Sequence, residues 1–237
     1  MGAGTLRAVG ERSVVLVHGA WHGAWCWEAV LEGLAAAGVR AAAADLPSVT
    51  RGSVEVADDA DHVRGVIESV GGPVVLIGHS YGGAVVTDAG THPAVEHVVY
   101  IAAFALAEGE SVTANGLTGG EEMDLGDALR FDGDVVHVDP KRATELFYHD
   151  CPPAVAAVAV ARLRPQSIAA MTSCPRSIAW RTKPSTYALC TDDRVVPVTL
   201  QRSSAARVPE VVEWPTSHSP FLSRPELVVD LCRDLAQ

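Results

Sequence analysis

One stretch of the sequence, "VVLIGHSYGGAVV" from residue 74 to 86, constrains the fold of this chain more than any other. Four apolar residues lead into Gly-His-Ser-Tyr-Gly, and small apolar residues follow. Such a pattern indicates a buried strand that turns abruptly into a helix. The serine between the glycines is either incidental to a tight connection or a nucleophile held on a strained turn, and the rest of the chain must distinguish the two.

Short apolar runs alternate with longer segments of helical period along most of the chain. Continuous apolar runs are typical of strands buried on both faces of a parallel sheet. Apolar residues recur at helical spacing from Val56 to Val70, and the residues from Ser223 to Glu226 predict a capping box that opens the last helix. The pattern predicts an α/β fold with a mostly parallel six-stranded sheet flanked by helices. The expected strands are residues 13–17, 39–44, 74–77, 95–101, 186–190 and 208–213.

The segment 107–183 interrupts this alternation. It contains loops, helical stretches that begin near Pro140 and Pro152, and no convincing strand. We therefore expect a helical cap inserted into a single domain, whose core comprises residues 1–106 and 184–237.

Composition excludes several classes of function. The chain has 237 residues, and 48% of them are hydrophobic, which suffices for the core of one globular domain. A formal net charge of -11 argues against nucleic acid or an anionic membrane as a partner, because both require a basic surface. No window approaches the roughly 18 uncharged apolar residues of a membrane span, and the N-terminus has no apolar signal region.

The five cysteines are odd in number and include no CxxC pair. A chain of this length needs no disulfides for stability, so we expect reduced thiols and a cytoplasmic location. The sequence leaves the oligomeric state open, with a homodimer as one alternative.

The stretch around Ser80 has the setting of a nucleophile elbow. Gly-x-Ser-x-Gly takes that form when a strand precedes it and a helix follows, and both are expected here. A side chain at Gly78 or Gly82 would collide with the neighbouring strand and helix, while Ser80 is forced into a strained conformation that projects its hydroxyl. The helix that begins here directs backbone N–H groups at the site. We therefore predict that the serine is a nucleophile.

A serine hydroxyl is a weak nucleophile, so the chain must also supply a histidine base and a carboxylate, in the order Ser, Asp, His. Among nine histidines, His218 follows the last strand, in a loop before the final helix. The carboxylate should end the preceding strand, where Asp192 and Asp193 follow "TYALC". We favour Asp193 because it stands four residues before Pro197 and because neighbours at a strand end point to opposite sides. Asp192 remains the alternative.

The pattern "HGAWHGAW" suggests a metal site through His18 and His22. Its glycines indicate a loop rather than a helix with ligands at i and i+4, and a third ligand is missing. We expect both histidines to support the loop and His79 to be a packed neighbour of Ser80. No metal or other cofactor is expected.

The stretches "VLVHGAWHGAWCW", "GHSYGG", "CTDDRVVP" and "SHSPFLSRPE" resemble the α/β-hydrolase superfamily. Within it the chain is similar to the branch of plant methyl-ester esterases, hydroxynitrile lyases and bacterial pyrethroid-hydrolase-like esterases. The resemblance implies a sheet without the first strands of the full fold, a helical cap, and a triad of Ser80, Asp193 and His218. It also implies an oxyanion hole formed by the backbone N–H groups of Ala20 and Tyr81, which would stabilise the charge of an acyl-transfer intermediate.

Esterases and lyases of this branch share the triad and differ beside it. Hydroxynitrile lyases have Thr or Asn after the strand-end histidine, and the Thr type has Lys after the catalytic histidine, whereas this chain has Gly19 and Ser219 there. The resemblance therefore favours a serine esterase that hydrolyses carboxylic esters. A lactone-opening or lactone-forming tailoring enzyme, a lyase, and a non-catalytic binding protein on the same fold remain alternatives.

The expected pocket walls are apolar, which favours a neutral, mostly apolar small-molecule ester, since a buried charge would need a partner. Nine acidic residues against one basic residue between 107 and 139 would also repel anions, although such charge runs are usually solvated. Arg162 and Arg164 could instead bind a carboxylate and reverse this preference. The expected pocket residues are Trp21, Tyr81, Phe104, Leu146 and Phe147.

Overall fold

The computed structural model describes residues 12–118 and 125–237, and its centre is one six-stranded sheet. The strands lie in the order β2-β1-β3-β4-β8-β9, and every neighbouring pair is parallel. All six expected strands are present, with ends that differ from the prediction by at most two residues. They are β1 (Ser13–Val17), β2 (Ala41–Ala44), β3 (Val74–His79), β4 (Val95–Ile101), β8 (Ser185–Cys190) and β9 (Glu210–Trp214).

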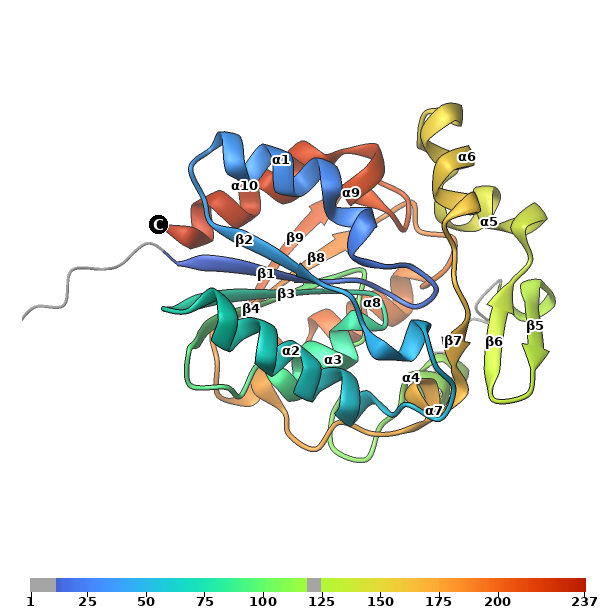
Figure 1. The fold of residues 1–237 in the computed structure, drawn as a ribbon, viewed down its shortest axis with the longest axis horizontal. Helices are drawn as coiled ribbons and strands as arrows, with labels where there is room; N and C mark the ends of the chain where they lie inside the picture. Colours follow the sequence, from blue (N-terminus) through green and yellow to red (C-terminus); the bar gives the residue numbers. More distant parts are fainter. Residues whose placement is uncertain (1–11, 119–124) are drawn as a thin grey trace, which may run out of the picture.

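Helices cover both faces of this sheet (Figure 1). Successive side chains of a strand point to opposite faces, so in β1 Val14 and Leu16 enter one buried core while Val15 and Val17 enter the other. The first core is covered by α1 (Glu28–Ala36) and α10 (Pro225–Ala236), and the second by α2 (Val56–Val70) and α3 (Gly82–Ala89). Two more helices of the sheet region are α8 (Val198–Ala205) and α9 (Pro220–Ser223). The predicted α/β architecture is confirmed.

The start of the last helix differs from the prediction. Helix α10 begins at Pro225, its N-cap is Arg224, and no side chain caps it. Ser223 ends the short helix α9, and its hydroxyl lies 3.5 Å from the carbonyl oxygen of Ser219. Glu226 instead accepts a hydrogen bond from Arg224. The predicted capping box is therefore wrong, because α9 already uses the serine.

Most of the segment 107–183, which we call the cap segment, lies beyond the carboxyl ends of the sheet strands, and its last residues run back along α3 to the start of β8 (Figure 1). Two of its helices begin at prolines, as predicted. The expectation of no strand is wrong, because three short strands form a separate antiparallel sheet. Its elements are α4 (Val112–Thr118), β5 (Leu129–Asp132), β6 (Val135–Val138), α5 (Pro140–Phe147), α6 (Pro153–Ala161), β7 (Gln166–Ser167) and α7 (Ile168–Thr172).

The hairpin of β5 and β6 escaped prediction because each strand is only four residues long and β5 is mostly exposed. Phe131 leaves 69% of its surface exposed, so β5 does not read as a buried apolar run. The chain turns at Gly133, whose φ is 59°. Asp132 pairs with Val135, so the two-residue loop is Gly133-Asp134, and a loop of this type is a hairpin signal that the sequence did carry.

The described residues also form four short 3₁₀ turns, which are η1 (Ala24–Trp27), η2 (Pro47–Val49), η3 (Gly126–Ala128) and η4 (Ala179–Arg181). Within the described ranges, every helix is too short or too polar to cross a membrane.

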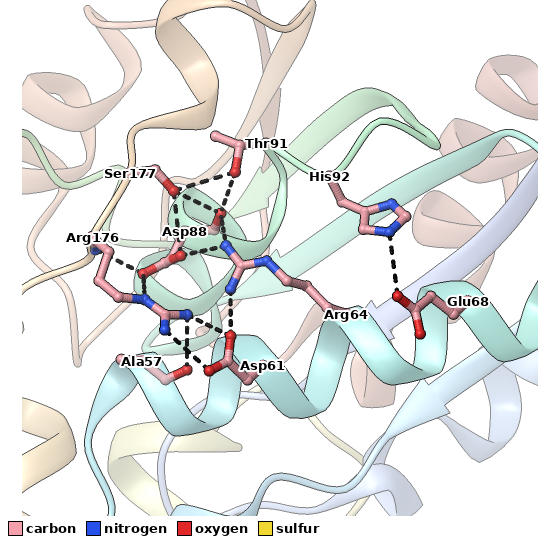
Figure 2. A network of polar contacts seen from close by, with 9 residues as sticks. All are labelled: Ala57, Asp61, Arg64, Glu68, Asp88, Thr91, His92, Arg176 and Ser177. Carbon is pink, nitrogen blue, oxygen red and sulfur yellow. Dashed lines mark hydrogen bonds and ion pairs between the residues drawn. The ribbon is translucent and has the colours of Figure 1, made fainter.

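A buried carboxylate joins α2, α3 and the last part of the cap segment (Figure 2). Asp88, in the last turn of α3, is fully buried and accepts hydrogen bonds from Arg64 of α2. It also accepts the backbone N–H of Arg176 at 2.7 Å and the hydroxyl of Ser177 at 3.3 Å. The exposed Asp61 pairs with both arginines. The network therefore fixes the helix that follows the predicted nucleophile.

Candidate active site

Ser80 occupies the sharp turn between β3 and α3, with a left-handed φ of 52°. The flanking glycines allow this turn. A Cβ at Gly78 would lie 2.5 Å from the carbonyl oxygen of Gly82, and a Cβ at Gly82 would lie 2.7 Å from the carbonyl oxygens of Val17 and His18. The predicted strained turn and close approach are confirmed.

His218 follows β9, and Asp193 follows the neighbouring strand β8. Nδ1 of His218 lies 2.7 Å from Oδ2 of Asp193, and both side chains are almost completely buried. A carboxylate only accepts hydrogen bonds, so the proton of the neutral ring is on Nδ1 and the lone pair is on Nε2. The structure thus pairs the predicted base with Asp193 and not with the alternative, Asp192.

His79 connects the elbow to the loop of His218. Its Nε2 lies 2.8 Å from the carbonyl oxygen of His218, and the two ring centroids are 4.5 Å apart. Ser80 is the next residue in the chain, so the predicted nucleophile and the predicted base share one buried edge of the sheet. His79 is a packed neighbour, as expected.

The carboxylate of Asp193 is held on both oxygens. Oδ1 accepts the backbone N–H groups of Val195, at 2.7 Å, and Val196, at 3.0 Å. Oδ2 accepts the side-chain amide of Gln201 at 3.0 Å, in addition to His218. Gln201 was not predicted from the sequence. The signal that could have suggested it is a polar residue on α8, about two helical turns after Asp192 and Asp193.

The oxyanion loop, residues 18–22, follows β1 and touches the elbow. A Cβ at Gly19 would lie 2.9 Å from the Cβ of Ser80. Trp21 has a left-handed φ of 63°, and its indole N–H donates to the carbonyl oxygen of Val136 at 3.0 Å. Ala20 is buried in this loop, and Tyr81 is buried just after the nucleophile. Their N–H groups as oxyanion donors stay a prediction.

Of the predicted pocket residues, Trp21, Phe104 and Phe147 lie at this site. Phe147 is 5.9 Å from Trp21 and 5.9 Å from His218 between ring centroids. The backbone N–H of Phe104 donates to the carbonyl oxygen of Ser80 at 3.2 Å. Leu146 precedes Phe147 in α5 and is fully buried in the core.

The side chain of Tyr81 was expected to line the pocket, and this is wrong. It is fully buried, and its hydroxyl donates to Oδ2 of Asp59 at 2.7 Å. The hydrogen bond to a carboxylate of α2 directs the ring into the core. The contribution of Tyr81 to chemistry is therefore restricted to its backbone.

Two buried histidines support the oxyanion loop. His18 Nε2 accepts the N–H of Leu46 at 3.0 Å, and its Nδ1 lies 2.8 Å from the carbonyl oxygen of Gly19. Nδ1 of His22 lies 2.8 Å from the carbonyl oxygen of Ala20. Burial lowers the pKa of His18 to about 4 and the pKa of His22 to about 3, so both rings are neutral at pH 7. In the part of the chain that the structure describes, no cluster of His, Cys, Asp or Glu could hold a metal ion.

Both arginines that could have received an anionic substrate have other partners. Arg162 donates to both oxygens of Glu28. Arg164 donates to both oxygens of Asp45 and to the carbonyl oxygen of His22. The pKa of Asp45 falls to about 2, chiefly because of its hydrogen bonds from Arg164. These contacts occupy the two guanidinium groups within the protein.

Comparisons with known proteins agree with this geometry. Pyrethroid hydrolase of Sphingobium wenxiniae is 29% identical, over 94% of this chain and 87% of that protein. Methylesterase 17 of Arabidopsis thaliana is 27% identical, over 92% of this chain and 88% of that protein. The crystal structure of a pyrethroid hydrolase from Sphingobium faniae superposes with a TM-score of 0.81 and 27% identity, covering 95% of this chain and 97% of that one. A model of the alpha/beta hydrolase family matches residues 14–231, and the chain belongs to that family.

Proposed function

We propose that this protein is a serine esterase that hydrolyses neutral, mostly apolar carboxylic esters. The observation that carries the proposal is the buried pair of His218 and Asp193, 2.7 Å apart, at the sheet edge where Ser80 stands on a strained turn. The relatives named pyrethroid hydrolase and methylesterase support ester hydrolysis as the reaction.

The reaction has two halves. In the first, Nε2 of His218 takes the hydroxyl proton of Ser80 while Oγ forms a bond to the ester carbonyl carbon. The carbonyl electrons move to oxygen, where the N–H groups of Ala20 and Tyr81 stabilise the charge. When the carbonyl re-forms, the alcohol leaves with the proton from His218. In the second half, water repeats the attack on the acyl-serine, and the carboxylic acid leaves.

The surroundings of the site favour neutral substrates. Trp21, Phe104 and Phe147 are buried apolar walls, and burial of hydrocarbon contributes about 25 cal/mol per Å². A substrate carboxylate would be desolvated there without a cation, because Arg162 and Arg164 pair with Glu28 and Asp45. Phe147 belongs to the cap segment, so we also propose that residues 107–183 cap the substrate pocket.

The space beside Ser80 argues against the lyase alternative. In the resembling lyases, Thr or Asn stands at the position of Gly19. A Cβ at Gly19 would lie 2.8 Å from Nδ1 of His79 and 2.9 Å from Cβ of Ser80. The larger side chain is therefore excluded unless the elbow moves.

A panel of substrates tests the proposal. We expect p-nitrophenyl and methyl esters to be hydrolysed, a transient acyl group to appear on Ser80 by mass spectrometry, and mandelonitrile to remain intact. Ser80→Ala should abolish turnover and leave the unfolding temperature unchanged, because it removes one oxygen and almost no volume. Mandelonitrile cleavage without ester hydrolysis would establish a lyase, and acylation in a single turnover without further product would indicate a binding protein. Faster opening of lactones than of any linear ester would favour the tailoring enzyme.

We also propose a cytoplasmic location. All five cysteines, which lie in the described part of the chain, are free thiols, as a reducing compartment would maintain them. Cell fractionation with detection of the protein tests this.

A further inference from the structure

Four consecutive residues of the cap segment, from Phe147 to Asp150, contact three loops around the candidate site, those that hold His22, Asp192 and His218. They follow directly from the end of α5, so one short turn reaches all of these loops. Phe147 packs against the ring of His218, Tyr148 bonds to His22, His149 bonds to the carbonyl oxygen of Asp192, and Asp150 accepts the N–H of Ser217.

The contact of Tyr148 with His22 is a hydrogen bond to the oxyanion loop, and its direction can be assigned. Nδ1 of His22 lies 2.8 Å from the carbonyl oxygen of Ala20, which can only accept, so Nδ1 carries the proton. Nε2 then has a lone pair, and the hydroxyl of Tyr148, 2.8 Å away, donates to it. A chain of hydrogen bonds thus runs from Tyr148 through His22 to Ala20.

We propose that Tyr148 is a positioning residue for catalysis: through His22 it fixes the orientation of Ala20 in the oxyanion loop. The inference rests on the proposed ester hydrolysis and adds a role for the cap segment in the chemical step. The hydroxyl of Tyr148 itself need not touch substrate.

The packing around His22 explains why the hydrogen bond is needed. The ring lies among Trp25, Phe147 and Phe221, with centroids 5.6 to 6.0 Å away. These apolar contacts hold the ring in place but offer no partner to Nε2. Without the hydroxyl of Tyr148, the buried lone pair of Nε2 is unpaired, and a change of tautomer that places the proton on Nε2 releases the carbonyl oxygen of Ala20. The peptide unit between Ala20 and Trp21 is then no longer fixed, which also frees the backbone at Ala20, whose N–H is the predicted oxyanion donor.

The test compares two substitutions that each remove one buried hydroxyl. Tyr148→Phe deletes the donor to His22. Tyr100→Phe is the control, because Tyr100 is also fully buried. Its hydroxyl lies 3.2 Å from that of Thr87, and within the described residues it makes no hydrogen bond to the oxyanion loop. We expect Tyr148→Phe to lower kcat for a p-nitrophenyl ester about 10- to 100-fold with KM within about twofold. Tyr100→Phe should leave kcat within about twofold.

A trifluoromethyl ketone separates positioning from a general loss of structure. It forms a hemiketal with Ser80 whose oxyanion needs the hole, so its inhibition constant should rise by the factor by which kcat/KM falls. In a His22→Phe background, Tyr148→Phe should have no further effect, because the residue acts through His22. Suppose that the unsubstituted protein hydrolyses esters and that Tyr148→Phe matches Tyr100→Phe in kcat and in the inhibition constant. The positioning role of Tyr148 is then overturned, while the proposed ester hydrolysis stands. If the unsubstituted protein hydrolyses no ester, the proposed function fails and takes this inference with it.

Discussion

At the scale of single residues, the two neighbouring carboxylates make a sharp comparison. Asp193 bonds to His218, and its other oxygen accepts two backbone N–H groups. We expect Asp193→Asn to lower kcat about 10,000-fold, because an amide cannot hold the proton of His218 on Nδ1. Asp192→Asn should change kcat less than about threefold. Steady-state kinetics on one ester checks both, and a reversed order would assign the acid to Asp192.

Two buried glutamines give a second comparison. The amide of Gln201 donates to Asp193 at 3.0 Å and accepts the backbone N–H of Cys190 at 2.9 Å. Gln201→Met should lower the free energy of unfolding by about 2 kcal/mol and kcat about tenfold, because it leaves a buried N–H unpaired and loosens the carboxylate.

Gln166 is the matched control for this change. It is also fully buried, but neither atom of its amide has a hydrogen-bond partner among the described residues. Gln166→Met removes no hydrogen bond to the described residues, so it should lower the free energy of unfolding by less than about 1 kcal/mol and leave kcat unchanged. Urea unfolding of both variants measures the difference, and equal losses of stability would contradict this account of the Asp193 contact.

At the scale of elements, the network around Asp88 joins α2 and α3 to the last part of the cap segment (Figure 2). Asp88→Ala should lower the free energy of unfolding by about 2 to 3 kcal/mol, because buried N–H and hydroxyl donors lose their acceptor. Asp61 still pairs with Arg64 and Arg176, which limits the loss.

The exposed Asp61 provides the control for that prediction. Its ion pairs are solvated, so Asp61→Ala should cost less than about 1 kcal/mol. Chemical denaturation of the two variants compares them directly. A larger loss for Asp61→Ala than for Asp88→Ala would show that the solvated ion pairs, and not the buried carboxylate, join the elements.

The elements predicted well are those whose signals are local in sequence. A run of apolar residues followed by Gly-x-Ser-x-Gly specifies both β3 and the turn at Ser80, and chain order then pointed to Asp193 and His218. The hairpin at Gly133 was missed because its strands are only four residues long and because β5 is exposed and contains Arg130 and Asp132. The predicted capping box at Ser223 is wrong because Ser223 is the last residue of the short helix α9, which the apolar pattern does not indicate.

The supporting contacts of the site were beyond sequence reasoning for a different reason. Tyr148 and His22 are 126 residues apart, and nothing in either stretch indicates the other. Gln201 is only eight residues from Asp193, yet its contact depends on the face that α8 turns to the loop. Such contacts are determined by how the whole chain packs, and local sequence patterns do not indicate that packing.

At the scale of the whole molecule, the acidic character of the cap segment matters less than the sequence suggested. Of its nine acidic residues up to 139, Glu121, Glu122 and Asp124 lie outside the described residues. Several of the others are neutralised by arginines: Glu110 by Arg207, Asp127 by Arg142, Asp139 by Arg130 and Glu108 by Arg181. The preference for neutral esters therefore rests on the apolar walls and the occupied arginines rather than on repulsion by this segment.

The buried histidines make the stability of the molecule dependent on pH. Burial lowers the pKa of His18 to about 4 and that of His22 to about 3, and it lowers the pKa of His79 well below its usual value. In the unfolded chain each would titrate near 6.5. Below that pH the unfolded chain binds protons that the folded protein excludes, so the free energy of unfolding must fall as the pH falls.

We expect this decline to begin near pH 6.5 and to reach up to about 1.4 kcal/mol per pH unit for each buried histidine. Urea unfolding between pH 7.5 and 5 measures it, and this window excludes Asp45, whose stabilising ion pair is lost only below its unfolded value of 3.8. Unfolding at pH 5 should take up about three protons from His18, His22 and His79, and His97, whose pKa burial also lowers, adds to this uptake. A flat profile between pH 7.5 and 5 would mean that the rings around the oxyanion loop are accessible to protons in the folded protein, and the neutral His22 that receives the hydrogen bond of Tyr148 would then lose its physical basis.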